Sequence, residues 1–597
     1  MAKTFGQLLV NNVLPSDLRS DDTLDKKTLY KKLYQHARRD PEDAARRMDK
    51  IRALGHELAT TEGISITLDD IEPRYKERDA VTRPLLNKIR HISDPRKRAA
   101  EIEKAQAKLL SATKRFGGSQ GMLVSSGTKG KPPQLMRMSM APMAARDPHG
   151  GAYPWLIHHS HAEGLRPSEM YSSNFETRNN QVASFLQITE PGDFAKIMVN
   201  NMNDQMILSE DCGTKNGILM STDDANIVDR VMARSEKGFR AGTIITPQVF
   251  SRLRKKRGQI MVRSPMTCEL NDGVCQKCYG YDEKGKMHTL GTNVGVRSAQ
   301  ALTEPLTQFQ LSAKHGVRQA GTDRTKLEGL SGLRQFLEMP KSFTNKATLS
   351  DVRGKVSKVE EAPQGGHRVY VGDKEYYTPP HLPPVVRKGD AVAPGDALSD
   401  GIPMPNEVVQ HKGLGEGRRY LVGRLHDLYS TQGLDVDKRH LEILARSHLN
   451  HVQIDNDPED RYYPGEIVNY TTFMKNLASD VKKVPVSKSL GQIMAGGHLH
   501  HTAGTEITPE IKSELSKGGI KEVSVARKPP EVSFVTRPIT RNPLLNPDWM
   551  ARLGHRHLKE SMLEGAYFGQ SSNIHSTHPI PAYTYGAEFG RGPKGRY

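Results

Sequence analysis

The sequence predicts a multidomain protein of the α+β class, built from long helices and small β-modules. At 597 residues the chain is too long for one hydrophobic core, so about three to five domains are expected. Apolar residues recur at helical spacing over much of residues 26–206. Residues 344–405 instead show short alternating runs separated by Lys-Gly-Asp and Pro-Gly-Asp turns, which is typical of small β-modules.

The composition favours an extended subunit that binds a polyanion or acidic partners. The net charge is +18, the isoelectric point is about 9.5, and the mean hydropathy is −0.61 with 36% hydrophobic residues. Only four cysteines are present, which argues against a disulfide scaffold and for a reducing compartment. The opening MAKTFGQLLVNNVLP lacks a signal-peptide layout, and no run of about 18 apolar residues predicts a membrane span. We therefore expect a cytoplasmic protein.

Charged helical patterns near residues 26–61 and 83–114 predict a solvated helical hairpin in the first part of the chain. The next stretch, 125–142, is rich in Gly, Pro and Met. Two glycines there permit turn conformations and flank Lys129, whose side chain is long enough to reach a phosphate. An ordinary surface loop is the alternative.

Residues 167–206 predict one long helix, because large apolar side chains recur at near-helical spacing. A helix of about 37 residues, at about 1.5 Å per residue, is about 55 Å long, which is enough to cross a cleft that holds a nucleic-acid duplex. Two alternatives stay open: an ordinary core helix, or two helices broken at Pro191–Gly192. Pro191 removes one backbone donor and is expected to kink the helix.

All four cysteines fall in one pattern, in which Cys212 is followed by Cys268, Cys275 and Cys278 with the spacing C-x6-C-x2-C. Two thiolates separated by two residues share a tight knuckle, and four thiolates suit tetrahedral Zn²⁺ with no position left open for chemistry. The pattern predicts a structural zinc ion that joins the distant first cysteine to the later knuckle. Free buried thiols are the alternative. The basic residues between 252 and 257 read as a solvated face.

The segment 294–321 reads as a helix that runs into a glycine-bounded loop. Glu304–Pro305 predicts a break, because the residue before a proline avoids helical angles. Beyond the break, four side chains are spaced to share one helix face: Gln308, Leu311, Ser312 and His315. Such a face offers an amide, an apolar contact and an imidazole to one ligand.

Further along the chain, residues 329–343 predict a returning helix, and residues 413–449 predict two amphipathic helices around Gly433. Residues 549–586 predict a helix followed by a tail rich in Pro and Gly. These elements complete the α+β pattern.

Three histidines close together, His498, His500 and His501, suggest a metal site by composition. The cysteines already account for a zinc ion, and GGHLHHTAGTEIT favours a strand and a turn. We therefore interpret this stretch as part of a β-module.

These motifs occur in an order that resembles the C-terminal half of the largest (β′) subunit of multisubunit DNA-directed RNA polymerases. VGVRSAQALTEPLTQFQLSAKHG resembles the trigger loop, and DCGT with CELNDGVCQKCYG resembles the β′ zinc site. HAEGL at 161–165 resembles the approach to the bridge helix, and SSGTKGKPPQ is similar to the F-loop. RRYLVGRLHDLYSTQGLDVDKRHLEIL also resembles a β′ segment. Four of its residues are expected to be architectural: Asp437, Lys438, His440 and Glu442.

The resemblance implies a β′-like architecture of six regions. They are a helical funnel (1–120), the F-loop and bridge helix (121–210), the zinc-binding segment (211–290), the trigger loop (291–343), β-modules with jaw- and dock-like helices (344–480), and a C-terminal β-module with the clamp base and switch region (481–597).

The resemblance also implies catalytic roles, since the family's trigger loop folds over the matched nucleotide and excludes water. His315 would then lie against the phosphates, Leu311 would pack on the base and Gln308 would reach the ribose. Ser312 stands where the family has Arg, which removes a charge from the site. Lys314 stands where the family has Phe and is the candidate to compensate.

Nucleotide and template contacts follow from the same resemblance. Lys129 stands where an Arg of the family's F-loop contacts the phosphates of the incoming nucleotide, although Lys is a point charge without the planar fork. Ile188 and Thr189 fall where the bridge helix faces the template base. Arg178 is also Arg in the family.

The family holds its catalytic Mg²⁺ with a D-x-D-G-D carboxylate loop, and that motif is absent from this sequence. We therefore expect a partner chain, a β′ N-terminal-like subunit, to hold Mg²⁺, beside a β-like subunit or its split halves. DNA template, RNA transcript and nucleoside triphosphates are the other expected partners, with structural Zn²⁺ in this chain. The departures at Pro191, Ser312 and Lys314 favour a split enzyme of a large bacteriophage, in the host cytoplasm or the virion.

A different class of protein stays open, namely a non-catalytic zinc protein that binds nucleic acid or a polymerase as a decoy or regulator. The order of the motifs favours the polymerase subunit. The subunit requires a stoichiometric complex with a D-x-D-G-D chain, whereas the regulator permits a lone stable protein.

Overall fold

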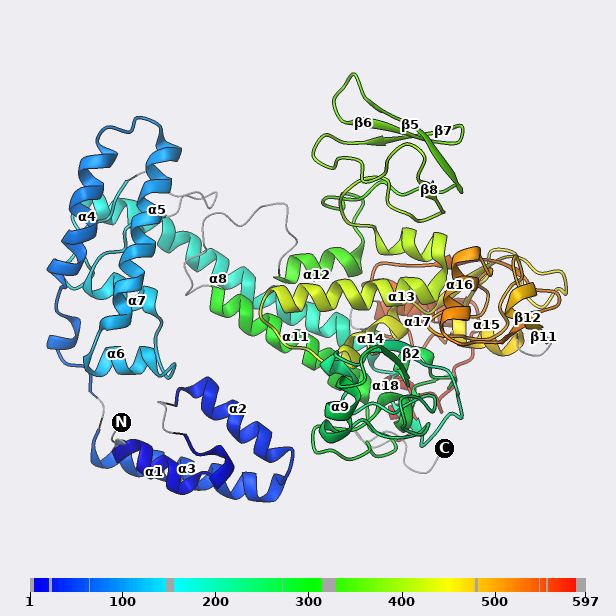
Figure 1. The fold of residues 1–597 in the computed structure, drawn as a ribbon, viewed down its shortest axis with the longest axis horizontal. Helices are drawn as coiled ribbons and strands as arrows, with labels where there is room; N and C mark the ends of the chain where they lie inside the picture. Colours follow the sequence, from blue (N-terminus) through cyan, green and yellow to red (C-terminus); the bar gives the residue numbers. More distant parts are fainter. Residues whose placement is uncertain are drawn as a thin grey trace. The chain divides into compact units, whose positions relative to one another are not determined.

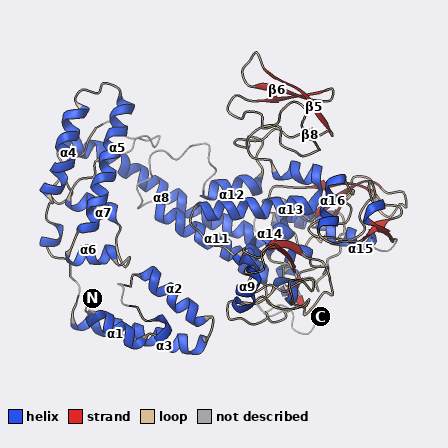
Figure 2. Ribbon diagram, in the orientation of Figure 1, coloured by secondary structure: helices blue, strands red, loops and turns tan. Residues whose placement is uncertain are grey.

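The computed structural model has the mixed α+β architecture that the sequence predicts, with helices and several small sheets (Figures 1 and 2). The residues it describes are 5–20, 24–63, 65–145, 155–270, 272–313, 329–477, 481–546, 548–554 and 557–586. The chain divides into two compact units: unit 1 is Met1–Glu190 with Gln308–Asp323, and unit 2 is Pro191–Thr307 with Arg324–Tyr597. None of the helices in these residues is long and apolar enough to cross a membrane.

Unit 1 is built from helices in the part of the chain that is described. They are α1 (Phe5–Val13), α2 (Lys26–Ala37), α3 (Pro41–Thr61), α4 (Tyr75–Ile89), α5 (Pro95–Ala112), α6 (Gly118–Ser125), α7 (Pro132–Ser139) and the first part of α8 (Pro167–Met202). Helix α3 begins where Asp40 accepts a hydrogen bond from the Asp43 backbone N–H, followed by a proline in the first turn. The sequence predicted one hairpin here, and the structure has two, because α2 packs on α3 and α4 packs on α5.

The apolar core of unit 1 lies between α4, α5 and α7. Its members include Leu85, Ile102, Leu109 and Met136, all of which are buried. The buried Arg78 guanidinium of α4 donates hydrogen bonds to both carboxylate oxygens of Glu163, at 2.8 and 2.7 Å. These bonds connect α4 to the loop before α8. This contact fixes the HAEGL stretch that precedes the long helix.

Helix α8 is a single helix of 36 residues, which confirms the long helix and excludes two helices broken at Pro191–Gly192. In its first turn, Glu169 accepts hydrogen bonds from the backbone N–H groups of His158 and Arg166, at 2.7 and 3.0 Å. The last turns bury Met198 and Met202 in the core of unit 2. Because this C-terminal end of α8 is buried, packing favours the helical conformation of the residues that follow Pro191.

Unit 2 contains the rest of α8, the remaining helices, of which α11 ends in unit 1, and the strands of the described residues. The helices are α9 (Pro247–Arg254), α10 (Gln276–Tyr279), α11 (Val294–Ala313), α12 (Gly329–Glu338), α13 (Pro405–Thr431), α14 (Lys438–His448), α15 (Tyr470–Leu477), α16 (Pro509–Lys517), α17 (Leu558–Tyr567) and α18 (Pro579–Thr584). The strands are β1 (Ile207–Ser209), β2 (Ile218–Ser221), β3 (Gln259–Val262), β4 (Val274–Cys275), β5 (Gly354–Glu361), β6 (His367–Val371), β7 (Lys374–Thr378), β8 (Ala391–Val392), β9 (His451–Asn456), β10 (Ile467–Asn469), β11 (Val481–Pro485), β12 (Glu522–Ala526) and β13 (Glu531–Val535).

The predicted β-module is an antiparallel sheet of order β7-β6-β5-β8, labelled in Figure 1. The predicted pair of amphipathic helices is also confirmed, as α13 and α14 on either side of Gly433. A second antiparallel sheet has the order β10-β9-β13, and β1 pairs with β4 in parallel.

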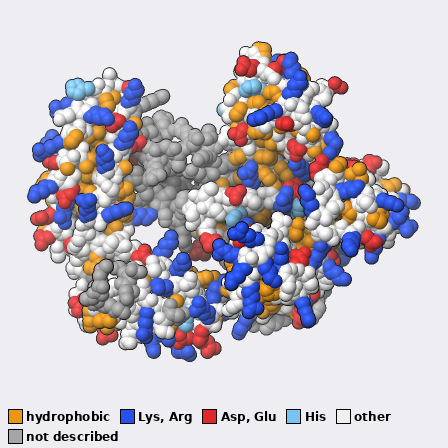
Figure 3. Space-filling view, in the orientation of Figure 1, with side chains coloured by type: hydrophobic (Ala, Val, Ile, Leu, Met, Phe, Trp, Pro, Cys, Tyr) orange, Lys and Arg blue, Asp and Glu red, His pale blue; other side chains and the backbone are white. Residues whose placement is uncertain are grey.

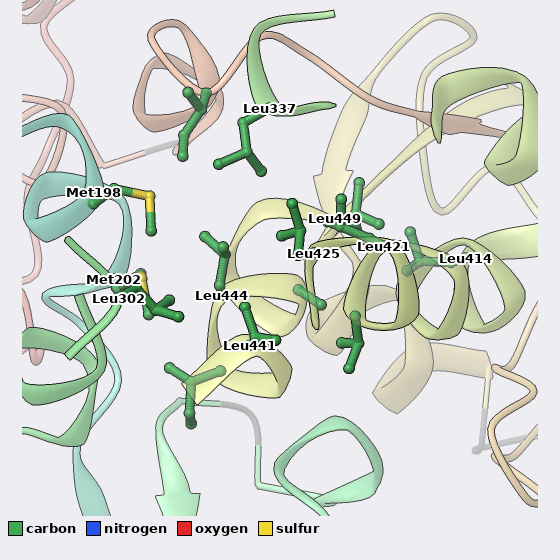
Figure 4. Packing of buried hydrophobic residues seen from close by; sticks show 14 of the residues in the cluster. Met198, Met202, Leu302, Leu337, Leu414, Leu421, Leu425, Leu441, Leu444 and Leu449 are labelled. Atoms are coloured by element: carbon green, nitrogen blue, oxygen red, sulfur yellow. The ribbon is translucent and has the colours of Figure 1, made fainter. Parts of the chain in front are cut away.

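The core of unit 2 gathers side chains from several helices around α14, as Figure 4 shows. Leu441 and Leu444 of α14 face Leu421 and Leu425 of α13, and Leu302 of α11 lies on the other side. Each fully buried leucine contributes roughly 1.5–3 kcal/mol to stability. This burial explains the amphipathic pattern of α13 and α14 in the sequence.

The predicted helix break at Glu304–Pro305 is wrong, because α11 continues through Pro305 to Ala313. Leu302 and Leu306 are buried on one face of the helix, so tertiary packing outweighs the local preference. The Tyr429 hydroxyl donates a 2.7 Å hydrogen bond to the Leu302 carbonyl, in the turn that the proline disturbs.

A buried ion pair joins α14 to the segment before the cysteine knuckle at residues 268–278. The Arg230 guanidinium donates two hydrogen bonds to the Glu442 carboxylate, at 2.8 and 2.6 Å, and both side chains are almost fully buried. Ser264 donates a third hydrogen bond to Glu442 at 2.7 Å. The expected architectural role of Glu442 therefore has a physical basis.

We predict that Glu442→Gln destabilises unit 2 by about 3–5 kcal/mol, because it removes the charged partner that accepts both hydrogen bonds of the buried Arg230 guanidinium. Hydrogen-exchange mass spectrometry on peptides from α14 measures the change as a loss of protection. The matched control is Glu510→Gln, which breaks the exposed pair with Arg353 and should cost no more than about 1 kcal/mol. Equal protection in both variants would contradict the prediction.

Candidate metal centre

Short elements of unit 2 bring the four cysteines together from distant parts of the sequence. The parallel pair β1 and β4 places Cys212, just beyond β1, next to Cys275 at the end of β4. Cys278 lies on α10, and Cys268 follows the turn at residues 265–267. The predicted grouping of the four thiols is thus present in the structure.

The spacing of the sulfur atoms fits a tetrahedral metal. All four Sγ atoms lie within 4.8 Å of one another, and those of Cys212 and Cys278 are 3.7 Å apart. A tetrahedron with Zn–S bonds of about 2.3 Å has edges of about 3.8 Å. Three of the cysteines are buried, and backbone N–H groups point at the sulfurs of Cys268 and Cys275, at 3.4 and 3.3 Å. These residues suit Zn²⁺ in a closed, structural site.

Two glycines allow the knuckle to fold. Gly273 and Gly280 have φ angles of 63° and 93°, and a Cβ at either position would overlap a backbone carbonyl, of Met206 and Asp229 respectively. Only glycine therefore fits at these two positions of the knuckle.

Arg263 is the functional residue that sequence reasoning missed. Its guanidinium donates to Cys278 Sγ and Cys212 Sγ at 3.2 Å each, and to Cys275 Sγ at 3.4 Å. Four thiolates carry twice the charge of Zn²⁺, so a buried cation beside them stabilises the centre. The nearest signal in the sequence is an arginine five residues before Cys268, which spacing alone does not single out.

Asp211 orients this arginine. Its carboxylate accepts hydrogen bonds from Arg263 and Lys277, both at 2.8 Å. Burial raises the pKa of Asp211, but the hydrogen bonds from Lys277, Gly213 and Arg263 outweigh it and hold the pKa at about 2. Burial alone lowers the pKa of the Arg263 guanidinium. The charge of the Cys278 thiolate and the hydrogen bonds that Arg263 donates outweigh burial, so the pKa of Arg263 lies above its usual value. Both groups are therefore charged at neutral pH.

Helix α14 supports the centre from behind. The Arg446 guanidinium donates to the backbone carbonyls of Pro265, Cys268 and Leu270, at 3.1, 2.9 and 2.6 Å. The loop that carries Cys268 is consequently held against the core of unit 2.

Among the described residues, those predicted to contact the nucleotide and the template do not form a cluster. Lys129 is exposed between Gly127 and Gly130, which both have positive φ, and Arg178 and Thr189 are exposed on α8. The side chain of Ile188 lies outside the described residues. These assignments remain predictions.

The predicted catalytic residues are described even less. Gln308, Leu311 and Ser312 fall in the last turns of α11, and their side chains lie outside the described residues. Lys314 and His315 lie wholly outside them. Their shared role therefore also remains a prediction.

Basic side chains lie over α9, as Figure 3 shows for the near face of the molecule. Arg252, Arg254, Lys255, Lys256 and Arg257 are all exposed. The Lys256 ammonium packs over the Phe239 ring and donates to the Lys237 carbonyl. These five exposed side chains form the solvated face that the sequence predicted.

The fold is that of an α+β protein of two compact units, and its four clustered cysteines suit a closed structural metal site. No protein-family model matches the chain. The chain is, however, distantly similar to proteins described as DNA-directed RNA polymerase subunit beta'. It is 25% identical to that of Caldanaerobacter subterraneus subsp. tengcongensis over 535 residues, covering 80% of this chain and 45% of the relative.

Two further relatives agree. The chain is 26% identical to the beta' subunit of Clostridium tetani over 575 residues, covering 87% of this chain and 49% of the relative. It is 26% identical to that of Dehalococcoides mccartyi over 577 residues, covering 78% of this chain and 44% of the relative. The chain thus spans less than half the length of these relatives.

We predict that Arg263→Lys lowers the zinc affinity about 10–100-fold, because a lysine ammonium is a compact point charge without the planar fork that reaches the sulfur atoms and Asp211 together. Competition with a chromogenic chelator measures the change. Arg252→Lys, on the exposed face of α9, is the matched control and should release zinc as the unaltered protein does. Identical release from both variants would refute the role of Arg263.

Proposed function

We propose that this chain is a subunit of a multisubunit DNA-directed RNA polymerase that corresponds to the C-terminal half of β′. The observation that carries the proposal is the similarity to β′ subunits over 78–87% of the chain, against 44–49% of each relative. The order of the motifs supports it, since the loop around Lys129, the long helix, the cysteine centre and the segment around His315 follow one another as in that family.

In this proposal α8 is the bridge helix. Its 36 residues at about 1.5 Å each give a length of about 54 Å, which suits an element that crosses a nucleic-acid cleft. Arg178, Ile188 and Thr189 would then contact the template strand. Lys129, in the loop between α6 and α7, would contact the phosphates of the incoming nucleotide.

The segment between α11 and α12 is the trigger loop of the proposed enzyme. Closing over a matched nucleotide, it would exclude water and complete the site. His315 would contact the phosphates, Leu311 the base and Gln308 the ribose. Ser312 and Lys314 are the departures from the family at this loop, and Lys314 would supply the missing positive charge.

The catalytic Mg²⁺ lies on a partner chain in this proposal, because this sequence has no D-x-D-G-D motif. The partners are a β′ N-terminal-like subunit with that motif, a β-like subunit or its split halves, the DNA template, the RNA transcript and nucleoside triphosphates. The cysteine centre holds zinc and takes no part in the reaction. The departures at Pro191, Ser312 and Lys314 support a split enzyme of a large bacteriophage, active in the host cytoplasm or packaged in the virion.

Mass spectrometry of the intact complex from producing cells tests the proposal. We expect this chain in a stoichiometric particle with a D-x-D-G-D chain and a β-like chain, and the particle should synthesise RNA on a DNA template. A lone, stable protein without such partners would refute the proposal and favour the regulator. Finding the D-x-D-G-D motif on the same polypeptide would refute only the split.

The compensation at the trigger loop gives a direct kinetic prediction. If Lys314 supplies the charge that Ser312 lacks, Lys314→Ala slows elongation by about ten-fold or more, whereas Ser312→Ala changes it by less than about two-fold. Single-round elongation assays of the assembled enzyme measure both rates. Equal mild effects of the two substitutions would exclude the compensation.

A further inference from the structure

Two neighbouring histidines of unit 2 are presented together by a strained turn. Backbone hydrogen bonds between His498 and His501, at 3.1 Å each, close the turn. Leu499 within it has a φ of 56°, a left-handed conformation that bulky residues rarely adopt, and burial of its side chain in an apolar cluster holds it there. The imidazole rings of His500 and His501 lie side by side as a result, with centroids 4.1 Å apart.

Helix α13 approaches this turn closely enough to bring a carboxylate to it. A Cβ on Gly415 would overlap the carbonyl oxygen of His500, so only glycine allows the contact. The next residue, Glu416, places its Oε2 atom 2.7 Å from His500 Nε2. Arg419 holds the same carboxylate through two hydrogen bonds, at 2.9 and 2.7 Å.

Helix α16 supplies a second carboxylate. Glu514 Oε2 lies 2.9 Å from His501 Nε2 and 3.9 Å from His500 Nε2. The three ligand atoms, two imidazole nitrogens and one carboxylate oxygen, all lie within 4.8 Å of one another. A tetrahedral zinc ion with bonds of about 2.0–2.1 Å requires separations of about 3.3 Å, which the two measured distances bracket.

We propose that this group is a second metal site, which binds a divalent transition metal of the zinc type through His500 Nε2, His501 Nε2 and the Glu514 carboxylate, with Glu416 beside His500 as a neighbouring carboxylate outside the ligand set. Imidazole nitrogens with carboxylate oxygens suit Zn²⁺, Co²⁺ or Ni²⁺ better than Mg²⁺ or Ca²⁺, which take oxygen ligands. Both imidazoles are largely buried.

The site differs from the cysteine centre in access and in strength. His501 and Glu514 line a cavity of about 830 Å³, so an ion can enter and leave. The Nδ1 atom of His501 is buried and has no hydrogen-bond partner among the described residues, so the support that normally orients a metal-bound histidine is missing. Such support is worth about 10–100-fold in affinity. The second metal is therefore exchangeable, and binding it clamps α16 to the histidine turn.

Metal titration of the full-length protein, in whatever complex it is purified, tests the proposal. Dialysis against a mild chelator removes exchangeable ions and leaves zinc on the cysteines. Calorimetric titration with Zn²⁺ then measures the remaining sites, and elemental analysis counts the ions retained. We expect one further equivalent of zinc to bind to the unaltered protein, with a rise in its unfolding temperature.

Glu514→Gln and His501→Gln should each abolish that further equivalent. His498→Gln is the matched control, since His498 lies in the same turn but outside the group, and it should retain the equivalent. Circular dichroism of each variant without added metal checks that the fold is kept. The proposal is overturned if the unaltered protein binds no further zinc, or if a folded Glu514→Gln variant still binds it.

Discussion

Unit 2 depends on one buried carboxylate, that of Glu442 on α14. Arg230 and Ser264 both donate to it, and both belong to the segment that leads to the cysteine knuckle. A buried charge without its partner is strongly destabilising, so the helix and the knuckle segment must fold against each other. Arg446, one turn further along α14, then holds the carbonyl of Cys268. The position of the metal centre is thereby fixed relative to the apolar core.

The two metal sites of unit 2 illustrate different uses of similar chemistry. The four thiolates form a closed centre, and Arg263 offsets part of their charge. The group of His500, His501 and Glu514 opens on a cavity and lacks part of its outer support. The polymerase proposal needs only the closed centre. The open site adds a clamp between α16 and the histidine turn of the same unit, independent of nucleotide addition.

Much of the fold was predictable from the sequence because it follows from local periodicity. The long helix α8, the helices on either side of Gly433 and the β-module all lie where the apolar spacing and the turn residues predicted them. The break at Pro305 was the clear error. Local preference argues against helix before a proline, but the burial of Leu302 and Leu306 outweighs that preference. The catalytic roles of the segment around His315 remain predictions, because the side chains of this segment lie outside the described residues.

The sequence by itself determined which residues bind the closed metal centre, since the C-x2-C spacing forces two thiolates onto one knuckle and no other cysteines compete. Only the tertiary structure decided what surrounds that centre and the second site. Glu416 meets His500 across 84 residues, and Arg263 meets Cys212 across 51. No local pattern in the sequence predicts such pairs, because tertiary packing brings them together. That packing depends on glycines such as Gly415, and only the position of the neighbouring backbone explains why a glycine is required there.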